Sequence, residues 1–231
     1  MDPLPAPTLR EQLANAVVLP VLVVDDVRTA VDLGRTLVDA GLPMLEITLR
    51  TDAALASIEA MARALDGEAI VGAGTVTSAR DLDAVRDAGA RFAVSPGAPP
   101  ALLAAAADGD LPLIPGVASA TEAMTAADAG FDTLKLFPAE AAGGVALLKA
   151  LAGPLPALRF CPTGGIGPNN YLDYLALDAV LCVGGSWVAP RHLVRRAAWD
   201  EIGRLVRRAL DQARAAAPTL RTAQSTAETP R

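Results

Sequence analysis

The strongest constraint on the fold of this chain is an eightfold alternation of short apolar runs and longer, alanine-rich amphipathic stretches. The runs are rich in Val, Ile and Leu, which is typical of strands that are buried on both faces of a parallel sheet. Their spacing is about that of one strand, one helix and two short loops. The expected strands are residues 17–24, 43–50, 69–75, 91–96, 111–115, 133–138, 158–163 and 179–184.

Eight strand–helix units are the number that closes a (β/α)8 TIM barrel, and this is the α/β fold that we predict. An open doubly wound sheet is the alternative. It is disfavoured because Val24-Asp25-Asp26, and no glycine-rich dinucleotide-binding turn, follows the first strand. Residues 7–16 are expected to form a helix that caps the N-terminal end, and residues 199–217 the last helix. We predict one barrel domain over residues 1–217 and a polar, disordered tail over residues 218–231.

Charge and composition exclude several classes of function. The formal net charge is −6 and the pI is near 4.8, which argues against a nucleic-acid-binding surface. Arg204, Arg207 and Arg208 recur at helical spacing and are interpreted as a solvated helix face. No secretion signal or membrane span is expected, because the apolar run at residues 16–24 is short and contains Pro20. We therefore expect a cytoplasmic protein that does not associate with membranes.

Histidine and cysteine, the usual ligands of transition metals, are few in this sequence. His192 is the single histidine and is expected at the surface, so no metal is expected to take part in the mechanism. Cys161 and Cys182 lie in apolar runs and are expected to be reduced and to pack as small buried hydrophobes.

Lys135 is the most unusual residue of the sequence. Of the 20 lysines and arginines, only Lys135 and Lys149 are lysines, and Lys135 lies inside the apolar run at residues 133–138. Burial of an ammonium group is costly unless the group is paired or neutral. A buried lysine is explained by a reaction that requires an amine, such as imine formation with a carbonyl substrate. A lysine that snorkels from a strand end is the structural alternative.

Side-chain alternation along two strands places polar groups inside the predicted barrel. Glu46, Thr48 and Arg50 share one face of their strand, and the leucines and isoleucine between them share the other. Because the apolar face must contact the helices, the polar face points inward. The same argument directs Lys135 and Phe137 inward, so that Lys135 and Glu46 are expected to meet. A purely structural buried ion pair is the alternative.

Two glycine pairs follow the last two predicted strands. Gly164-Gly165 comes after the seventh strand, and Gly184-Gly185-Ser186 comes at the end of the eighth. In (β/α)8 barrels these loops commonly bind phosphate through backbone N–H groups, and glycine permits the close approach. Tight turns alone would also account for each glycine pair.

Several segments, in order along residues 12–210, resemble the bacterial 2-keto-3-deoxy-6-phosphogluconate (KDPG) aldolases, which also act as 4-hydroxy-2-oxoglutarate (KHG) aldolases. The related phosphogalactonate aldolases fit less well. The arginine-rich last helix and the residues after Ala217 do not resemble the family. The matching segments are Leu45–Thr51, Val71–Val76, Ser95–Gly97, Leu113–Gly116, Lys135–Glu140, Arg159–Ile166 and Gly184–Trp187.

The resemblance implies a metal-free and cofactor-free class I aldolase that acts through an imine, assembled as a homotrimer of barrels. Its substrate would be a phosphorylated 2-keto sugar acid, cleaved to pyruvate and glyceraldehyde 3-phosphate in Entner–Doudoroff-type catabolism. The matching positions make Lys135 the imine-forming amine and Glu46 the general acid and base. The implied substrate contacts are Arg50, Thr75, Pro96, Phe137 and Thr163, and the implied phosphate contacts are Gly164, Gly165, Gly185 and Ser186.

Two further interpretations remain open at this stage. The enzyme could prefer KHG or a galactonate epimer over KDPG. A barrel that binds a phosphorylated ligand without catalysis would leave both Lys135 and Glu46 unexplained.

Overall fold

The computed structural model describes the backbone of residues 8–227 and the side chains of residues 8–216. The strands are β1 (Val18–Leu22), β2 (Met44–Thr48), β3 (Ile70–Gly74), β4 (Ala93–Val94), β5 (Leu113–Ile114), β6 (Gly116–Val117), β7 (Thr133–Leu136), β8 (Arg159–Phe160) and β9 (Val183–Gly185). The helices are α1 (Leu9–Asn15), α2 (Val27–Asp39), α3 (Ala54–Ala64), α4 (Ala79–Asp87), α5 (Pro100–Ala107), α6 (Ala120–Asp128), α7 (Ala139–Ala142), α8 (Gly144–Ala152), α9 (Tyr171–Leu175), α10 (Arg191–Arg195) and α11 (Trp199–Ala227).

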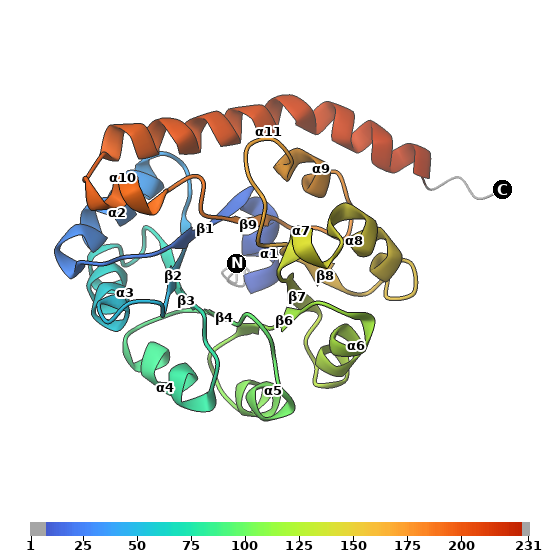
Figure 1. Cartoon of the computed structure of the whole chain (residues 1–231), viewed down its shortest axis with the longest axis horizontal. Coiled ribbons are helices and arrows are strands. Elements are labelled where there is room, and N and C mark those ends of the chain that lie inside the picture. The colour runs from blue at the N-terminus through green and yellow to red at the C-terminus, as the bar shows by residue number, and fades with distance from the viewer. Residues whose placement is uncertain (1–7, 228–231) are drawn as a thin grey trace, which may run out of the picture.

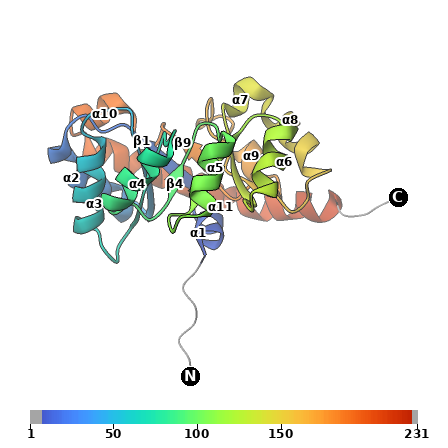
Figure 2. The same cartoon turned by 90° about the horizontal axis from the view of Figure 1, so that it is seen from below.

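The strands lie around the centre of the molecule, α1 lies near this centre, and the other helices lie outside the strands (Figure 1). One parallel sheet has the order β5-β4-β3-β2-β1-β9, and a smaller parallel sheet has the order β6-β7-β8. The long helix α11 runs past α10 and α9 and extends beyond the rest of the molecule toward the C-terminus (Figures 1 and 2).

The prediction of a closed eight-stranded TIM barrel is wrong, because the hydrogen-bonded strands form two separate sheets. β5 and β6 lie on either side of Pro115, which has no N–H group to continue a ladder. Between β8 and β9 the contact is limited to the isolated bridges Phe160–Val180 and Thr163–Gly184. Pro162 interrupts the ladder there in the same way. The chain therefore has a related α/β fold with a six-stranded and a three-stranded sheet.

The predicted end of the last helix is also wrong. α11 continues to Ala227, so residues 218–227 are helical rather than disordered, and the rest of the predicted tail lies outside the described residues. The added segment contains Pro218 and three threonines, which do not favour a helix interior, so local propensity does not account for the extension. Extension of an existing helix avoids the cost of a new nucleus. The predicted N-terminal helix is confirmed as α1, which a capping box between Thr8 and Glu11 begins.

The predicted alternation of side chains along the strands is confirmed. Leu45, Ile47, Leu134 and Leu136 belong to the main hydrophobic cluster that the helices cover. A second cluster lies on the inner face near the amino ends of the strands, and it contains Leu13, Leu19, Met44, Phe92, Val94, Ile114, Cys161 and Cys182. Beyond this apolar cluster, toward the carboxyl ends of the strands, the inner face becomes polar. In the described part of the chain, none of the helices combines the length and the apolar character needed to span a membrane.

Candidate active site

Lys135 and Glu46 meet on the inner face, as their strand positions predict. Lys135 comes from β7 in the small sheet and Glu46 from β2 in the large sheet, and their Nζ and Oε1 atoms are 3.6 Å apart. Lys135 is 5% exposed and Glu46 is 1% exposed. The fold therefore joins its two sheets at a buried pair of an amine and a carboxylate.

The Oε1 atom of Glu46 is a buried acceptor with no hydrogen bond among the described residues. The distance to Lys135 is short enough for an ion pair and too long for a hydrogen bond. A buried oxygen without a hydrogen bond is unfavourable for stability, and such atoms in native structures require an explanation. A site that takes up a substrate or transfers a proton between these groups provides one.

Gly74 makes the position of Glu46 possible. β3 pairs with β2 so that Gly74 lies opposite Thr48, two residues beyond Glu46. A Cβ atom on Gly74 would overlap Glu46 Oε1 and would lie 2.8 Å from its Cδ atom. The carboxylate therefore occupies space that only glycine at residue 74 leaves free.

The side chain of Phe137 lies beside the amine of Lys135. The Nζ atom is 5.2 Å from the ring centroid, which is within the range of a cation–π contact. The ring is half-buried and packs against Gly164, where an added Cβ atom would lie 3.3 Å from two ring carbons. Phe137 thus connects the amine to the first of the predicted phosphate-binding loops.

Four further predicted residues lie at the carboxyl ends of the strands. Arg50 is exposed just beyond β2, and its Nε atom donates a 3.1 Å hydrogen bond to Thr48. Thr75 follows β3 directly after Gly74, and its φ of +62° is unusual for a β-branched residue. Thr163 is buried beside Gly184. Pro96 follows β4, and its backbone lies against Gly116, the partner of Lys135 in the β6–β7 pair.

The predicted phosphate-binding glycines lie on two adjacent segments. Gly164 and Gly165 have φ values of +101° and +77°, which favour glycine. The bridge between Thr163 and Gly184 places this loop next to the end of β9. Gly185 is the last residue of β9, and the exposed Ser186 follows it. The two loops therefore lie side by side, as their positions in the sequence predict.

Sequence reasoning missed a hydrogen bond that links the first glycine loop to α9. The hydroxyl of Tyr174 donates to the carboxylate of Glu140, whose side chain packs against Gly165. The backbone N–H of Glu140 donates a 3.1 Å hydrogen bond to the carbonyl of Gly164. Burial and the hydrogen bond to Glu140 raise the pKa of Tyr174. Glu140 belongs to a segment that carries the family resemblance, but nothing in the sequence indicates its partner.

A second missed contact lies at the end of β1. Asp25 accepts hydrogen bonds from the Nε atoms of Arg191 and Arg195 on α10, at 3.0 and 2.8 Å. These hydrogen bonds lower the pKa of Asp25. They fix the β1–α2 loop to the helix that follows β9.

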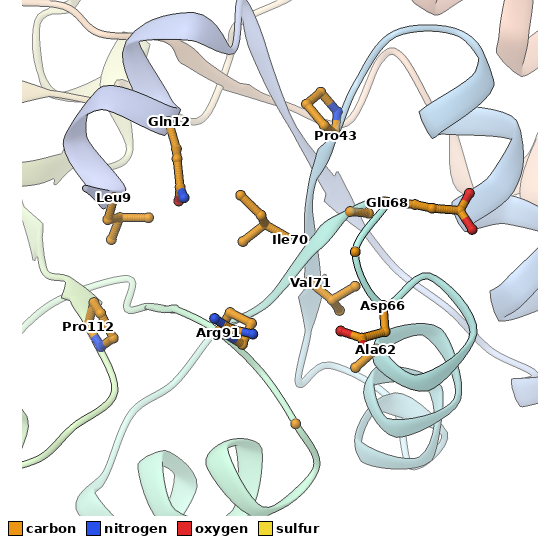
Figure 3. Close-up of a pocket in the computed structure, with 13 residues that line it drawn as sticks. Leu9, Gln12, Pro43, Ala62, Asp66, Glu68, Ile70, Val71, Arg91 and Pro112 are labelled. Carbon is orange, nitrogen blue, oxygen red and sulfur yellow. The ribbon is translucent and has the colours of Figure 1, made fainter. Parts of the chain in front are cut away.

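A cavity of about 550 Å³ opens at the opposite end of the strands (Figure 3). Leu9, Gln12, Pro43, Ile70 and Arg91 are among its lining residues, and the last three precede or begin strands. None of the predicted site residues lines this cavity.

The arrangement at the carboxyl ends can perform covalent chemistry on a carbonyl compound. A primary amine can form an imine, and a carboxylate beside it can transfer the protons that imine formation and breakdown require. Adjacent glycine-rich turns can accept an anionic group at the other end of the same molecule. These features define the class of the protein as an enzyme with a candidate imine-forming site.

Comparison with known proteins agrees with this class. The family model for KDPG and KHG aldolases matches residues 9–205. The 2-dehydro-3-deoxy-phosphogluconate aldolase of Pseudoalteromonas atlantica is 51% identical over 193 residues, which are 84% of this chain and 89% of that protein. The KHG/KDPG aldolase of Escherichia coli is 48% identical over 202 residues, 87% of this chain and 94% of that protein.

A solved structure shows the same fold. The KDPG aldolase of Legionella pneumophila, with pyruvate captured at low pH as a covalent carbinolamine intermediate, has a TM-score of 0.84 and 41% identity. The likeness covers 87% of this chain and 97% of that one. The chain belongs to the KDPG and KHG aldolase family, and it is a lyase.

Proposed function

We propose that this aldolase cleaves KDPG to pyruvate and glyceraldehyde 3-phosphate, and KHG to pyruvate and glyoxylate, through an imine on Lys135. The observation that carries the proposal is the 3.6 Å separation of the buried Lys135 Nζ and Glu46 Oε1 atoms. The names of the relatives support both substrates, and the carbinolamine of the Legionella enzyme supports covalent capture of pyruvate by the same class of site.

The reaction begins when the neutral amine of Lys135 attacks the C2 ketone of the substrate. Glu46 transfers the protons that convert the carbinolamine to the imine with loss of water. The cationic imine accepts the electron pair of the C3–C4 bond when a base removes the proton of the C4 hydroxyl. This step releases glyceraldehyde 3-phosphate and leaves an enamine. Protonation of the enamine and hydrolysis of the imine then release pyruvate and regenerate the amine.

The other residues hold the substrate in this proposal. Arg50, Thr75 and Thr163 bind the carboxylate end and the neighbouring oxygens, and Pro96 and Phe137 line the pocket. Gly164, Gly165, Gly185 and Ser186 bind the phosphate through backbone N–H groups and the exposed hydroxyl. The adjacency of the two glycine loops supports this last role.

We also propose the setting in which the enzyme works. Residues 1–217 act as one catalytic domain, the chain assembles as a homotrimer, and the enzyme acts in the cytoplasm without a metal or cofactor. The main hydrophobic cluster extends from Val18 to Ala213, which supports a single domain. Equilibrium ultracentrifugation tests the trimer, and assay in the presence of a chelator tests independence from metals.

Comparison of three substrates tests the proposed function. The full chain is assayed for pyruvate release from KDPG, from its galactonate epimer and from KHG, with Lys135→Met as the matched inactive variant. We expect wild-type cleavage of KDPG and KHG, with the larger kcat/KM for KDPG, and no cleavage by Lys135→Met. Failure to cleave either substrate, or retained activity in Lys135→Met, contradicts the proposal.

A further inference from the structure

A groove of about 890 Å³ lies between α10 and α11, outside the candidate active site. The two helices run beside one another on the edge of the molecule (Figure 1). Trp187, Pro190, Leu193 and Leu205 give the groove apolar walls. The volume is in the range of sites that bind small organic molecules.

Three arginines on α11 also line the groove, and none of them has a charged partner. Arg204, Arg207 and Arg208 make no hydrogen bond or ion pair in the described part of the chain. The two carboxylates of the groove are already engaged outside it, since Glu201 pairs with Arg196 and Asp211 pairs with Arg214, each at 3.5 Å.

This concentration of unpaired guanidinium groups occurs in a chain with a net charge of −6. Like charges close together on one helix are unfavourable by themselves. A bound anion that contacts two or three of the arginines relieves the repulsion and forms charge-assisted hydrogen bonds. His192, which is exposed on α10, adds a further donor to the same groove.

Trp187 supplies a fixed aromatic surface at one side of the groove. Its indole is half-buried and contacts Tyr171 with ring centroids 5.6 Å apart. The Tyr171 hydroxyl is held in turn by a 2.9 Å hydrogen bond to the carbonyl of Ala209 on α11. A planar ligand can pack against such a surface with little loss of side-chain entropy.

We propose that the groove binds a nucleoside di- or triphosphate. The base packs among Trp187, Leu193 and Leu205, and the phosphates contact Arg204, Arg207 and Arg208. The site adjoins the second glycine loop, because Trp187 follows Ser186 and its ring packs directly on Gly185. This site is separate from the aldol reaction, and its existence does not depend on the proposed substrates.

Calorimetric titration of the full chain with ATP tests the site. The probes are ATP and inorganic tripolyphosphate, and the variants are the double substitution R204Q and R208Q and the control R80Q. Arg80 is an exposed arginine on α4, on the side of the molecule away from α11 (Figure 1), and R80Q removes one positive charge outside the groove. Circular dichroism verifies that each variant is folded.

We expect one ATP per chain, about tenfold weaker binding in the double variant and unchanged binding in R80Q. Tripolyphosphate should bind more weakly than ATP, because it lacks the ring. The proposal is overturned if wild type binds neither probe at millimolar concentration, or if R80Q weakens binding as much as the double variant does. Equal affinity for tripolyphosphate and ATP would also overturn the assignment of a nucleoside ligand.

Discussion

Replacement of Gly74 by alanine tests whether the position of Glu46 controls the rate of the reaction. The added Cβ atom would overlap Oε1 and would lie 2.8 Å from Cδ and 2.9 Å from Cγ of Glu46. The backbone of Gly74 is not in the left-handed region, so the effect of the substitution is steric. To restore an ordinary contact of 3.4 Å, the Cδ atom must move by at least 0.6 Å, and Oε1 must move farther.

A displacement of this size has a large effect on catalysis. Misplacement of a reacting group by about 1 Å can cost about 100-fold in rate, and a general acid–base group contributes about 10²–10⁴-fold. We therefore expect kcat for KDPG cleavage to fall about 100-fold in Gly74→Ala, with a smaller change in KM.

Steady-state measurement of pyruvate release from KDPG provides the assay. Gly153→Ala is the matched control, because nothing lies within 4 Å of a Cβ atom at that position and the residue follows α8. The control should retain wild-type kinetics. A folded Gly74→Ala enzyme with wild-type kcat would refute the reasoning.

Three other predictions concern contacts that the fold brings together. Tyr174→Phe removes the hydrogen bond to Glu140 beside Gly165. This substitution should raise KM for KDPG about tenfold, with a smaller effect on KM for unphosphorylated KHG. Equal effects on both substrates would argue against a role of this contact at the phosphate-binding loop. Asp25→Asn should lose at most about 1 kcal/mol of unfolding free energy at pH 7. The pKa of Asp25 is lowered in the folded state. The stabilisation by its ion pairs is therefore present above the unfolded pKa of about 3.9 and is lost as the pH falls from there toward the folded pKa. The unfolding free energies of wild type and variant should thus converge in acid denaturation experiments. Cys161 and Cys182 are buried with their Sγ atoms 3.4 Å apart. Their mutual hydrogen bond, together with burial, raises the pKa of Cys182, so a thiol reagent should label the two cysteines only on unfolding. Labelling of the folded protein at the rate of an exposed thiol would contradict this prediction.

The sequence predicts the local features of the site well, because they follow from short-range rules. Alternation along β2 and β7 is sufficient to direct Glu46 and Lys135 to the same interior. The positions of the two glycine pairs after consecutive strands likewise place their loops side by side. The exposed position of His192 and the burial of both cysteines also agree with expectation.

Features that depend on contacts between distant residues could not be predicted in this way. Eight apolar runs indicate eight strands, but whether a ladder is continuous depends on N–H groups that Pro115 and Pro162 lack. The pairing of Tyr174 with Glu140 joins residues 34 positions apart, and the contacts of Asp25 join residues more than 160 positions apart. No local pattern identifies these partners.

The most direct test of the account is chemical trapping of pyruvate on the enzyme. Wild-type protein is incubated with pyruvate and borohydride, digested, and mapped by mass spectrometry, with Lys135→Met treated in parallel. The account predicts one reduced pyruvate per chain, located on Lys135, and no label on Lys135→Met. Label on the exposed Lys149, or no label on active wild-type enzyme, would contradict it.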